Sequence, residues 1–464
     1  MPQPQARSNH AIVIGGSIAG LFAARVLLNH FQQVTLIERD SFPNHPGFRP
    51  GVPQSQHVHI LLTQGQRYLE QLFPGILAEL TTAGAPTVNW TAEWCFLGIW
   101  GWHPRLKTEL QGVACSRILL EYLILQRLKA YANLTILESC QVQTLLRSQE
   151  ANRISGVRLN WRKACSSVPQ LQEDTLSADL VVDASGRNSA LPKWLTTLGY
   201  SAPEETVVNS FLGYASRWYE KPEGFKPDWQ GATLSSSLQE TSRGGTLFPI
   251  EGDRWILTLG GIAQDQPPTD EQGFLEFANS LRSPLIYDAI KDAKPLSPIY
   301  AYRRTENCWR HYEKLNSLPE GIVALGDAVC AFNPVYGQGM TIAAQGAITL
   351  DQCLRQAISN PQPNFSSHFQ QCLAQIIATP WIMATAEDSR WPTTVGAKQN
   401  WLMSLMQGYT DEVLRLVPDD PDLLKAFANV IHLVEPPATL FQPGIALKVL
   451  GSYSLRSLGH LAQP

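Results

Sequence analysis

"GDAVCAFNPVYGQGM", residues 326 to 340, follows the short apolar run Gly321-Ile-Val-Ala-Leu325. The run predicts a buried strand, and the chain leaves it through Gly-Asp, passes a proline and enters a helix through Gly-Gln-Gly-Met. Glycines at such a turn let the backbone come close to a ligand. The segment indicates a backbone shaped around a bound cofactor, which the rest of the chain has to identify.

The amino-terminal segment has the pattern of a nucleotide-binding strand, turn and helix. The apolar run Ala11–Ile14 is followed by Gly15-Gly-Ser-Ile-Ala-Gly20 and then by apolar residues at helical spacing. Such a turn points helix-start amides and the positive end of the helix dipole at a pyrophosphate, and Glu38 is placed to accept ribose hydroxyls. Ser17 replaces the middle glycine of GxGxxG, which weakens this fingerprint without breaking it.

Residues 15 to 19 also nearly match GxSxG, the nucleophile elbow of hydrolases, which likewise lies on a strand-to-helix turn. The last position is Ala19 rather than glycine, and Glu38 suits a ribose, so we favour dinucleotide binding. This motif alone does not separate FAD from NAD.

Charge, apolar segments and cysteine spacing exclude several classes of function. The 464 residues carry a net charge of −4, which argues against a nucleic-acid partner because such proteins show a clustered basic face. No segment approaches the roughly 18 apolar residues of a membrane span. The eight cysteines are scattered without a CxxC pair, which favours reduced thiols in a cytoplasmic protein over disulfides or a metal site.

The predicted strands of the nucleotide domain come from separate parts of the chain: residues 11–38, 135–146, 178–184 and 321–325. Residues 206–262 alternate as strands of an inserted sheet, and residues 364–464 are mostly helical. We predict an α/β fold, α+β overall, with a Rossmann-like FAD-binding domain, an inserted mainly antiparallel substrate domain and a helical carboxyl-terminal region. The expected boundaries are 1–60, 112–200 and 300–360 for the first, 61–111 and 201–299 for the second, and 361–464 for the third.

Two later segments point to the cofactor. ADLVVDASGRNSALPKWL, residues 178–195, ends a strand in Asp183, and residues 321–340 end one in Gly326-Asp327. With the amino-terminal motif they resemble the single-component flavoprotein monooxygenases and their relatives, built on the fold of para-hydroxybenzoate hydroxylase. The resemblance spans Ala11 to about Leu350 and implies FAD as the cofactor.

The resemblance also implies roles for residues. Asp327 would hydrogen-bond the ribityl chain, and the amides of residues 337–340 would face the pyrimidine edge of the flavin, where a helix amino terminus suits the negative charge of the reduced ring. Glu38 and Arg39 would meet the adenosine, Val142 the adenine, and Arg117 the pyrophosphate or ribityl region. The candidate cofactor-binding residues are Gly15, Ser17, Ile18, Ala19, Gly20, Glu38, Arg39, Arg117, Val142, Asp183, Asp327, Pro334, Gly337, Gln338, Gly339 and Met340.

Three further segments, at residues 49–75, 100–105 (WGWHPR) and 331–340, look like the flavin epoxidases of polyether antibiotic biosynthesis. That likeness implies a secondary-metabolism monooxygenase in which a flavin C4a-hydroperoxide transfers one oxygen atom of O2 to an apolar alkene or aromatic substrate, by epoxidation or hydroxylation. The protein has to keep the intermediate dry and hold the target carbon close to it. The candidate pocket residues are Trp100, Trp102, Phe211, Phe248 and Phe332.

No catalytic residue is certain, because the chemistry is carried by the flavin. His57 is a tentative proton or hydrogen-bond donor, and Arg49 could contact flavin or substrate. The pair His57 and His59 has no third ligand nearby in the sequence, so we expect no metal. Electrons would come from NAD(P)H directly or through a separate flavin reductase, because the sequence holds no second dinucleotide fingerprint.

Three alternatives remain open. Flavin halogenases share the fold, but they add a WxWxIP motif and a catalytic lysine, and Trp100-Gly-Trp102 continues into His103-Pro104 instead. Prenyl or alkene reductases would use the same FAD to saturate double bonds. A non-enzymatic lipid carrier is the least favoured.

Overall fold

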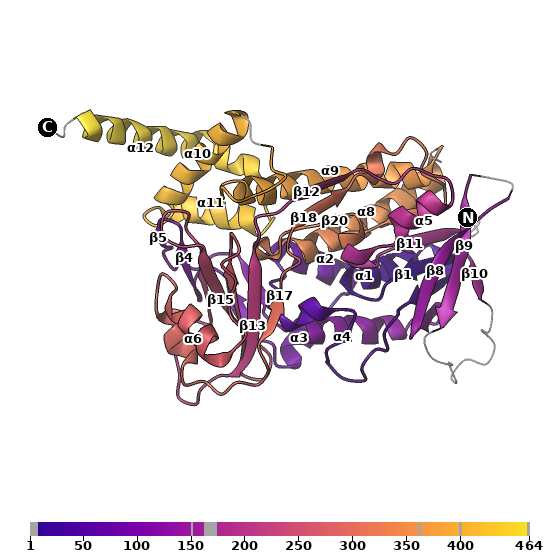
Figure 1. Cartoon of the computed structure of the whole chain (residues 1–464), viewed down its shortest axis with the longest axis horizontal. Helices are drawn as coiled ribbons and strands as arrows, with labels where there is room; N and C mark the ends of the chain where they lie inside the picture. The colour runs from indigo at the N-terminus through magenta and orange to yellow at the C-terminus, as the bar shows by residue number, and fades with distance from the viewer. Residues whose placement is uncertain (1–7, 150–151, 162–173, 361–362, 399–400, 462–464) are drawn as a thin grey trace, which may run out of the picture.

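The computed structural model describes residues 8–149, 152–161, 174–360, 363–398 and 401–461 (Figure 1). Within these ranges no helix is long and apolar enough to cross a membrane. The α-helices are α1 (Ile18–Leu27), α2 (Thr63–Leu72), α3 (Ile76–Thr82), α4 (Arg117–Lys129), α5 (Leu191–Thr197), α6 (Glu271–Asn279), α7 (Leu285–Ile290), α8 (Gly339–Ser359), α9 (Phe365–Asp388), α10 (Trp401–Leu416), α11 (Pro421–Ile431) and α12 (Pro443–Leu461).

A parallel sheet forms the centre of the first domain, as predicted. Its strand order is β19-β11-β1-β2-β7, and every pairing is parallel. The buried residues of these strands are mostly apolar, and they pack in one core with side chains of α1, α2, α4, α8 and α9. The strands are β1 (Ser8–Ile14), β2 (Phe31–Ile37), β7 (Leu134–Leu137), β11 (Leu180–Asp183) and β19 (Ile322–Ala324).

The segment predicted as one strand over residues 135–146 forms two strands. β7 ends at Leu137, and β8 (Cys140–Arg147) belongs to a separate sheet with β9 (Ile154–Trp161) and β10 (Thr175–Ser177). Ser139 lies between β7 and β8 with φ of 54°, in the left-handed region, and this turn ends the first strand. Two polar residues, Glu138 and Ser139, separate the strands, and such a short polar step does not by itself distinguish a turn from a strand with one solvent-facing side.

The second sheet has the order β17-β13-β16-β15-β14-β4-β5 and is antiparallel except where β14 pairs with β4. Residues 251–253 form the turn of a hairpin that joins β15 and β16 within the predicted inserted sheet. Helices α6 and α7 cover one face of this sheet. Its strands are β4 (Trp94–Gly98), β5 (Gly101–Trp102), β13 (Gly213–Glu220), β14 (Gly231–Leu234), β15 (Arg243–Ile250), β16 (Arg254–Gly261) and β17 (Tyr300–Tyr302).

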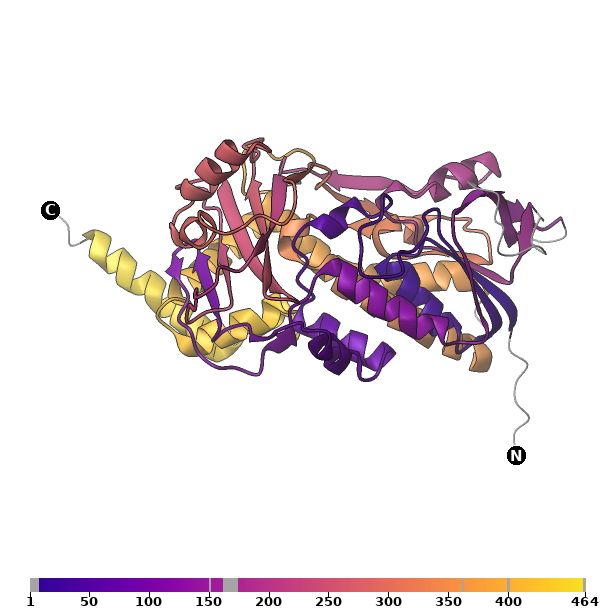
Figure 2. The same ribbon diagram turned by 90° about the horizontal axis from the view of Figure 1, so that it is seen from below.

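Two small sheets connect the larger units. β12 (Glu205–Val208), β18 (Asn307–Arg310) and β20 (Cys330–Ala331) form one, and β3 (Thr87–Asn89) pairs with β6 (Gln111–Val113) in the other. Helices α10 and α11 lie beside the second sheet, and α12 extends away beyond it (Figures 1 and 2). Ala428 of α11 packs in the same core as Trp90 and Phe248, so the carboxyl-terminal region closes the face of the second sheet opposite α6 and α7.

The packing divides the segment 61–111, which we assigned to the substrate domain. Leu69, Leu72 and Ile76 of α2 and α3 are buried in the core of the first domain. Only from about Thr87 does the chain pair with strands outside that core. Helices α2 and α3 cover α8 and α4 because their apolar faces find partners there, and the apolar pattern of an amphipathic helix does not specify which partner it covers.

Gly20 allows α1 to pack onto the turn after β1. A Cβ atom at this position would lie 1.8 Å from the carbonyl oxygen of Gly15, a backbone atom that cannot move without disturbing the turn. We therefore expect Gly20→Ala to lower the free energy of unfolding by about 3 kcal/mol or more, at the upper end for overpacking. Chemical denaturation measures this loss. Gly444→Ala, at an exposed α12 glycine with open space around it, is the control and should change stability little.

Candidate cofactor and substrate site

A single cavity of about 1420 Å³ runs from the carboxyl edge of the parallel sheet, past the second sheet, to α9, α10 and α11. This volume exceeds that of a pocket for one ordinary small molecule and leaves room for a cofactor and a substrate together. The turn after β1 and the segment 326–340 line one part of it. Apolar side chains of the second sheet and of the carboxyl-terminal helices line the other part.

The first turn of α1 lies at the wall of this cavity. Its N-cap residue, Ser17, makes no side-chain capping bond, and the first turn contains no acidic residue. Ser17 Oγ instead donates to Glu121 Oε1 at 2.7 Å. Gly15 has φ of 98°, and a Cβ there would meet the carbonyl oxygen of Ala184 at 2.6 Å. An uncapped helix amino terminus beside a glycine turn fits a pyrophosphate group.

Glu38 is anchored at the end of β2. Its Oε2 accepts from the Gly16 amide at 2.8 Å, and its Oε1 accepts from the Asp40 amide at 3.0 Å. A carboxylate has about four lone-pair positions, so these two bonds leave acceptor capacity on the cavity side. The geometry fits a ribose diol, as the sequence pattern indicated.

Arg49 belongs to a buried group of charges at the same end of the cavity. Its Nη1 lies 3.2 Å from Glu38 Oε2, and its Nη2 lies 3.0 Å from Glu121 Oε2. Burial alone would raise the pKa of Glu121, but the guanidinium groups of Arg117 and Arg49 outweigh it and hold that pKa below its usual value. Arg49 therefore lies next to the Glu38 end of the cavity and is not among the residues that line it.

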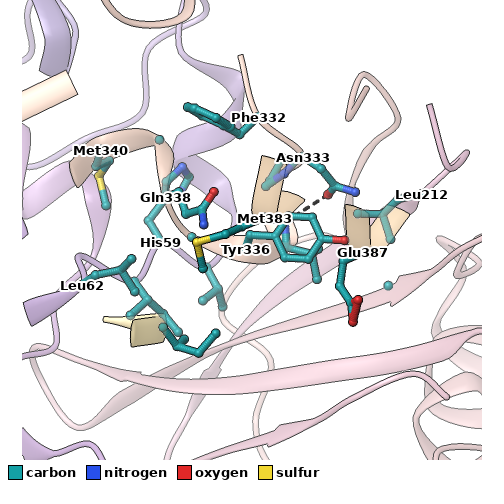
Figure 3. A pocket seen from close by; sticks show the side chains of 18 of the residues that line it. His59, Leu62, Leu212, Phe332, Asn333, Tyr336, Gln338, Met340, Met383 and Glu387 are labelled. Carbon is teal, nitrogen blue, oxygen red and sulfur yellow. Dashed lines mark hydrogen bonds between the residues drawn. The ribbon is translucent and has the colours of Figure 1, made fainter. Parts of the chain in front are cut away.

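The segment that follows β19 forms the second part of the candidate cofactor site. Gly337 has φ of 66°, which suits glycine, and α8 begins at Gly339 with no side-chain cap and no acid in its first turn. A Cβ added to Gly339 would meet nothing within 4 Å. The buried Oε1 of Gln338 has no hydrogen-bond partner. Figure 3 shows Gln338, Met340 and His59 among the side chains that line the cavity. This wall has unpaired polar groups and space for a ring system.

Asp388, at the end of α9, holds this segment in place. It is 1 % exposed and accepts hydrogen bonds from Asn333 Nδ2 at 3.0 Å, Tyr336 Oη at 2.8 Å and Asn307 Nδ2 at 2.6 Å. Burial raises the pKa of Asp388, and the hydrogen bonds from Tyr336 and Asn333 act in the opposite direction. The carboxyl-terminal region therefore fixes the Asn333-Pro334 turn and also lines the cavity through residues of α9, α10 and α11.

His57 and His59 lie in an extended segment that passes the cavity. His57 Nδ1 is 2.7 Å from Ser216 Oγ, and burial, with a smaller contribution from His59, lowers the pKa of His57 to about 3. His59 donates through Nδ1 to the His57 carbonyl oxygen at 3.1 Å, and burial, assisted by Arg117, lowers its pKa to about 4. Both rings are thus neutral at pH 7, and His59 Nε2 carries a lone pair.

The structure brings most of the predicted site residues to this cavity. The lining includes Gly15, Ser17, Ile18, Ala19, Glu38, Arg39, His57, Trp100, Arg117, Val142, Asp327, Phe332, Pro334, Gly337, Gln338, Gly339 and Met340. Asp327 is half-buried there, and burial raises its pKa against the opposing effect of Arg187.

Besides Arg49, five predicted site residues are not in the lining. Gly20 packs on Gly15, and Asp183 is buried and accepts from Ser185 and Ser189. Phe248 is 1 % exposed in the core with Trp90 and Trp94, because it points to that core from β15. The remaining two are Trp102, which is 43 % exposed at the edge strand β5, and Phe211, in a turn with φ of 54°.

Several residues that line the cavity were not among the predicted site residues. Met383, Glu387 and Arg390 come from α9, and Met406 and Phe427 come from α10 and α11. Figure 3 shows Met383 and Glu387 at the same part of the cavity as Tyr336 and Leu212. An amphipathic helical pattern marks these positions as apolar or half-buried, but it does not state what they face.

Comparisons with known proteins agree with this geometry. No protein-family profile matches the chain. The chain is 32 % identical to protein Rv3254 of Mycobacterium tuberculosis over 432 residues, which cover 92 % of this chain and 90 % of that protein. This chain belongs to the family of Rv3254.

Solved structures similar to this member of the Rv3254 family show its fold. The flavin-dependent brominase Bmp2 has a TM-score of 0.62 at 16 % identity, over 92 % of this chain and 99 % of that one. PqsL, a probable FAD-dependent monooxygenase from Pseudomonas aeruginosa, has a TM-score of 0.58 at 17 % identity, over 90 % and 100 %. The flavin-dependent halogenase CmlS has a TM-score of 0.63 at 17 % identity, over 93 % and 77 %. The fold is therefore that of FAD-dependent monooxygenases and flavin halogenases.

The low pKa of His57 makes stability depend on pH. The unfolded state takes up a proton near pH 6.5, whereas the folded state resists protonation down to about pH 3, so acidification favours unfolding. Between pH 7 and pH 5 this histidine should cost roughly 2 kcal/mol of stability. His57→Gln should remove that part of the pH dependence in denaturation curves. His45→Gln, at an exposed site, should leave the wild-type slope, and an equal slope in His57→Gln would contradict the assignment.

Replacement of Asp388 tests the anchor of the Asn333-Pro334 turn. Asp388→Asn keeps the shape but turns an amide nitrogen toward donors from Asn333, Tyr336 or Asn307, so one buried donor loses its acceptor. We expect a loss of about 2–3 kcal/mol in the free energy of unfolding. Thermal and chemical denaturation measure it. Asp419→Asn, at an exposed position, serves as the control, and equal stability of the two variants would show that the network contributes little.

Proposed function

We propose that this chain is an FAD-dependent monooxygenase that transfers one oxygen atom from O2 to a large apolar alkene or aromatic substrate. One observation carries the proposal: a single cavity joins two uncapped helix amino termini, those of α1 and α8, to a wide apolar chamber. A flavin enzyme of this kind needs its cofactor and substrate in the same enclosed space. The fold shared with Bmp2 and PqsL supports the same conclusion.

FAD would lie along the cavity with its two ends on different segments. The α1 turn would hold the pyrophosphate, Glu38 and Arg39 the adenosine ribose, and Val142 the adenine. Asp327 and the amides that begin α8 would hold the ribityl chain and the flavin ring. When bound and reduced, FAD would activate O2 and supply the oxygen atom.

The chain's own side chains would exclude water and orient the substrate. Phe96, Trp100, Leu212, Met383 and Phe427 line the cavity and are apolar. His57 and His59 are neutral because burial lowers the pKa of each to about 3 and about 4, so they add no charge beside an apolar substrate. His59 Nε2 can accept a hydrogen bond while the ring stays neutral at pH 7.

Epoxidation of an alkene is the more specific form of the proposal. It rests on the likeness of residues 49–75, 100–105 and 331–340 to the flavin epoxidases of polyether biosynthesis. The large apolar chamber fits a long hydrocarbon substrate as well as an aromatic one. Hydroxylation would use the same arrangement.

Halogenation is the second candidate, because Bmp2 and CmlS share the fold. The resemblance to halogenases implies a lysine between flavin and substrate. In the part of the chain that the structure describes, no lysine lines the cavity. Oxygen transfer to the substrate therefore needs fewer assumptions. Reduction of a prenyl chain would use the same cavity and is distinguished by its indifference to O2.

We also propose that electrons reach the flavin from NAD(P)H, either directly or through a separate flavin reductase. The cysteines are scattered along the sequence without a CxxC pair, which supports a reducing compartment such as the cytoplasm.

The purified protein provides the test. It should be yellow or take up FAD, consume O2 when NADPH and a flavin reductase are supplied, and transfer label from 18O2 to a product from a panel of long alkenes and phenols. Product formation without O2 would favour the reductase alternative, and halide-dependent product the halogenase. A colourless protein that does not bind added FAD would contradict the proposal.

Gly339→Val tests the proposed flavin site by a change that should lower FAD affinity without lowering stability. The added side chain would meet no protein atom within 4 Å at Cβ, so it should enter the space assigned to the flavin and leave stability nearly unchanged. We expect FAD affinity to fall at least about tenfold, equivalent to about 1.4 kcal/mol. Gly444→Val, in the first turn of α12 with the same open surroundings, controls for the effect of valine on a helix start. Equal FAD affinity of the two variants would contradict the placement.

A further inference from the structure

Three metal-ligand side chains meet between α8 and α9, outside the cavity. The ligand atoms of Cys353, His368 and Cys372 all lie within 4.8 Å of one another. His368 Nε2 is 3.8 Å from Cys372 Sγ. Cys353 is buried, and the other two side chains are half-buried. None of the three lines the candidate cofactor site, so the group has no role in the function proposed above.

We propose that Cys353, His368 and Cys372 bind a Zn²⁺ ion, with a water molecule as the fourth ligand. Tetrahedral zinc, with bonds of about 2.3 Å to sulfur and about 2.0 Å to nitrogen, places these ligand atoms roughly 3.5–3.8 Å apart. The 3.8 Å between His368 Nε2 and Cys372 Sγ is already at that separation. The remaining ligand atoms need to shift by no more than about 1 Å, which side-chain torsions can supply.

The local sequence explains why these atoms converge. His368 and Cys372 are four residues apart on α9, so their side chains leave the same face of the helix. Cys353 is on α8, which packs along α9. The two elements supply two soft thiolates and one imidazole, which is a donor set that zinc prefers.

A disulfide between Cys353 and Cys372 is the alternative use of the same thiols. It would join the sulfur atoms of Cys353 and Cys372 and would not involve His368 Nε2. Zinc uses all three. Binding releases one proton from each thiol to solvent, and no oxidant is required.

The position of the group gives the ion a structural role. Cys353 lies roughly 20 Å along α8 from Gly339, and Cys372 lies roughly 24 Å along α9 from Asp388. These helices carry the candidate flavin wall and the anchor of the Asn333-Pro334 turn at their other ends. A metal ion here would tie α8 to α9 far from the chemistry.

The experiment uses the full chain without an affinity tag. Zinc content is measured by elemental analysis, and the metal-free protein, shown to be folded by circular dichroism, is titrated with Co²⁺ as a spectroscopic probe. We expect one ion per chain and a thiolate-to-cobalt charge-transfer band with the visible bands of tetrahedral cobalt. Cys353→Ser, Cys372→Ser and His368→Ala should each weaken binding at least tenfold. Cys95→Ser, a thiol on β4 away from the group, should bind like wild type.

Three outcomes would overturn the proposal. They are a folded wild-type protein that binds neither Zn²⁺ nor Co²⁺ with one-to-one stoichiometry, binding that persists unchanged in the three variants, and a Cys353–Cys372 disulfide in the protein as purified without reductant. Flavin binding is measured in parallel. A protein that binds flavin but no metal would contradict only this inference. A protein that binds metal but no flavin would contradict only the proposed function.

Discussion

Backbone amides that no side chain satisfies are the constraint on which this structure depends. The first turns of α1 and α8 both lack capping side chains and acids, and both reach the same cavity. Parallel strands bring their carboxyl ends to one edge of a sheet, so the turns after β1 and β19 are held near each other by topology alone. Two positive helix ends at one edge favour an anionic, electron-rich ligand over water.

Buried ion pairs and hydrogen bonds stabilise the two turns at the carboxyl edge of the parallel sheet. Arg49 and Arg117 balance Glu38 and Glu121 beneath the α1 turn, where either charge alone would be costly to bury. At the other turn, Asp388 collects donors from Asn333 and from the loop around it. The two halves of the site are thus preorganised by different parts of the chain, the first within the parallel-sheet domain and the second by the carboxyl-terminal helices.

The features that local sequence pattern predicts are those that depend on residues close together in the chain. The strand, glycine turn and helix at residues 11–31 and 321–340 follow from local pattern, and the structure has them where expected. The α/β fold with an inserted antiparallel sheet is also as predicted. These features depend on neighbours within about twenty residues, which periodicity and turn chemistry describe.

Features that depend on distant contacts were missed. Alternation along β15 shows that Phe248 is on one face, but only tertiary packing decides that this face joins the core with Trp90 instead of the cavity. Asp388 is 55 residues from Asn333, and an acid near the end of a helix carries no local sign of that partner. The same holds for α2 and α3, whose apolar faces are clear in the sequence although their packing partner is not.

The fold of this chain is shared by proteins with different activities. Bmp2 and PqsL share it with this chain at only 16 % and 17 % identity, yet one is a brominase and the other a probable monooxygenase. A fold does not determine the reaction, so the difference has to lie in side chains around the cofactor. In this chain those side chains are apolar groups of the second sheet and of α9 to α11, two neutral histidines, and the charged pair Glu387 and Arg390 of α9. The apolar groups exclude water from this part of the cavity, and the ion pair between Glu387 and Arg390 balances the two charges that α9 places there.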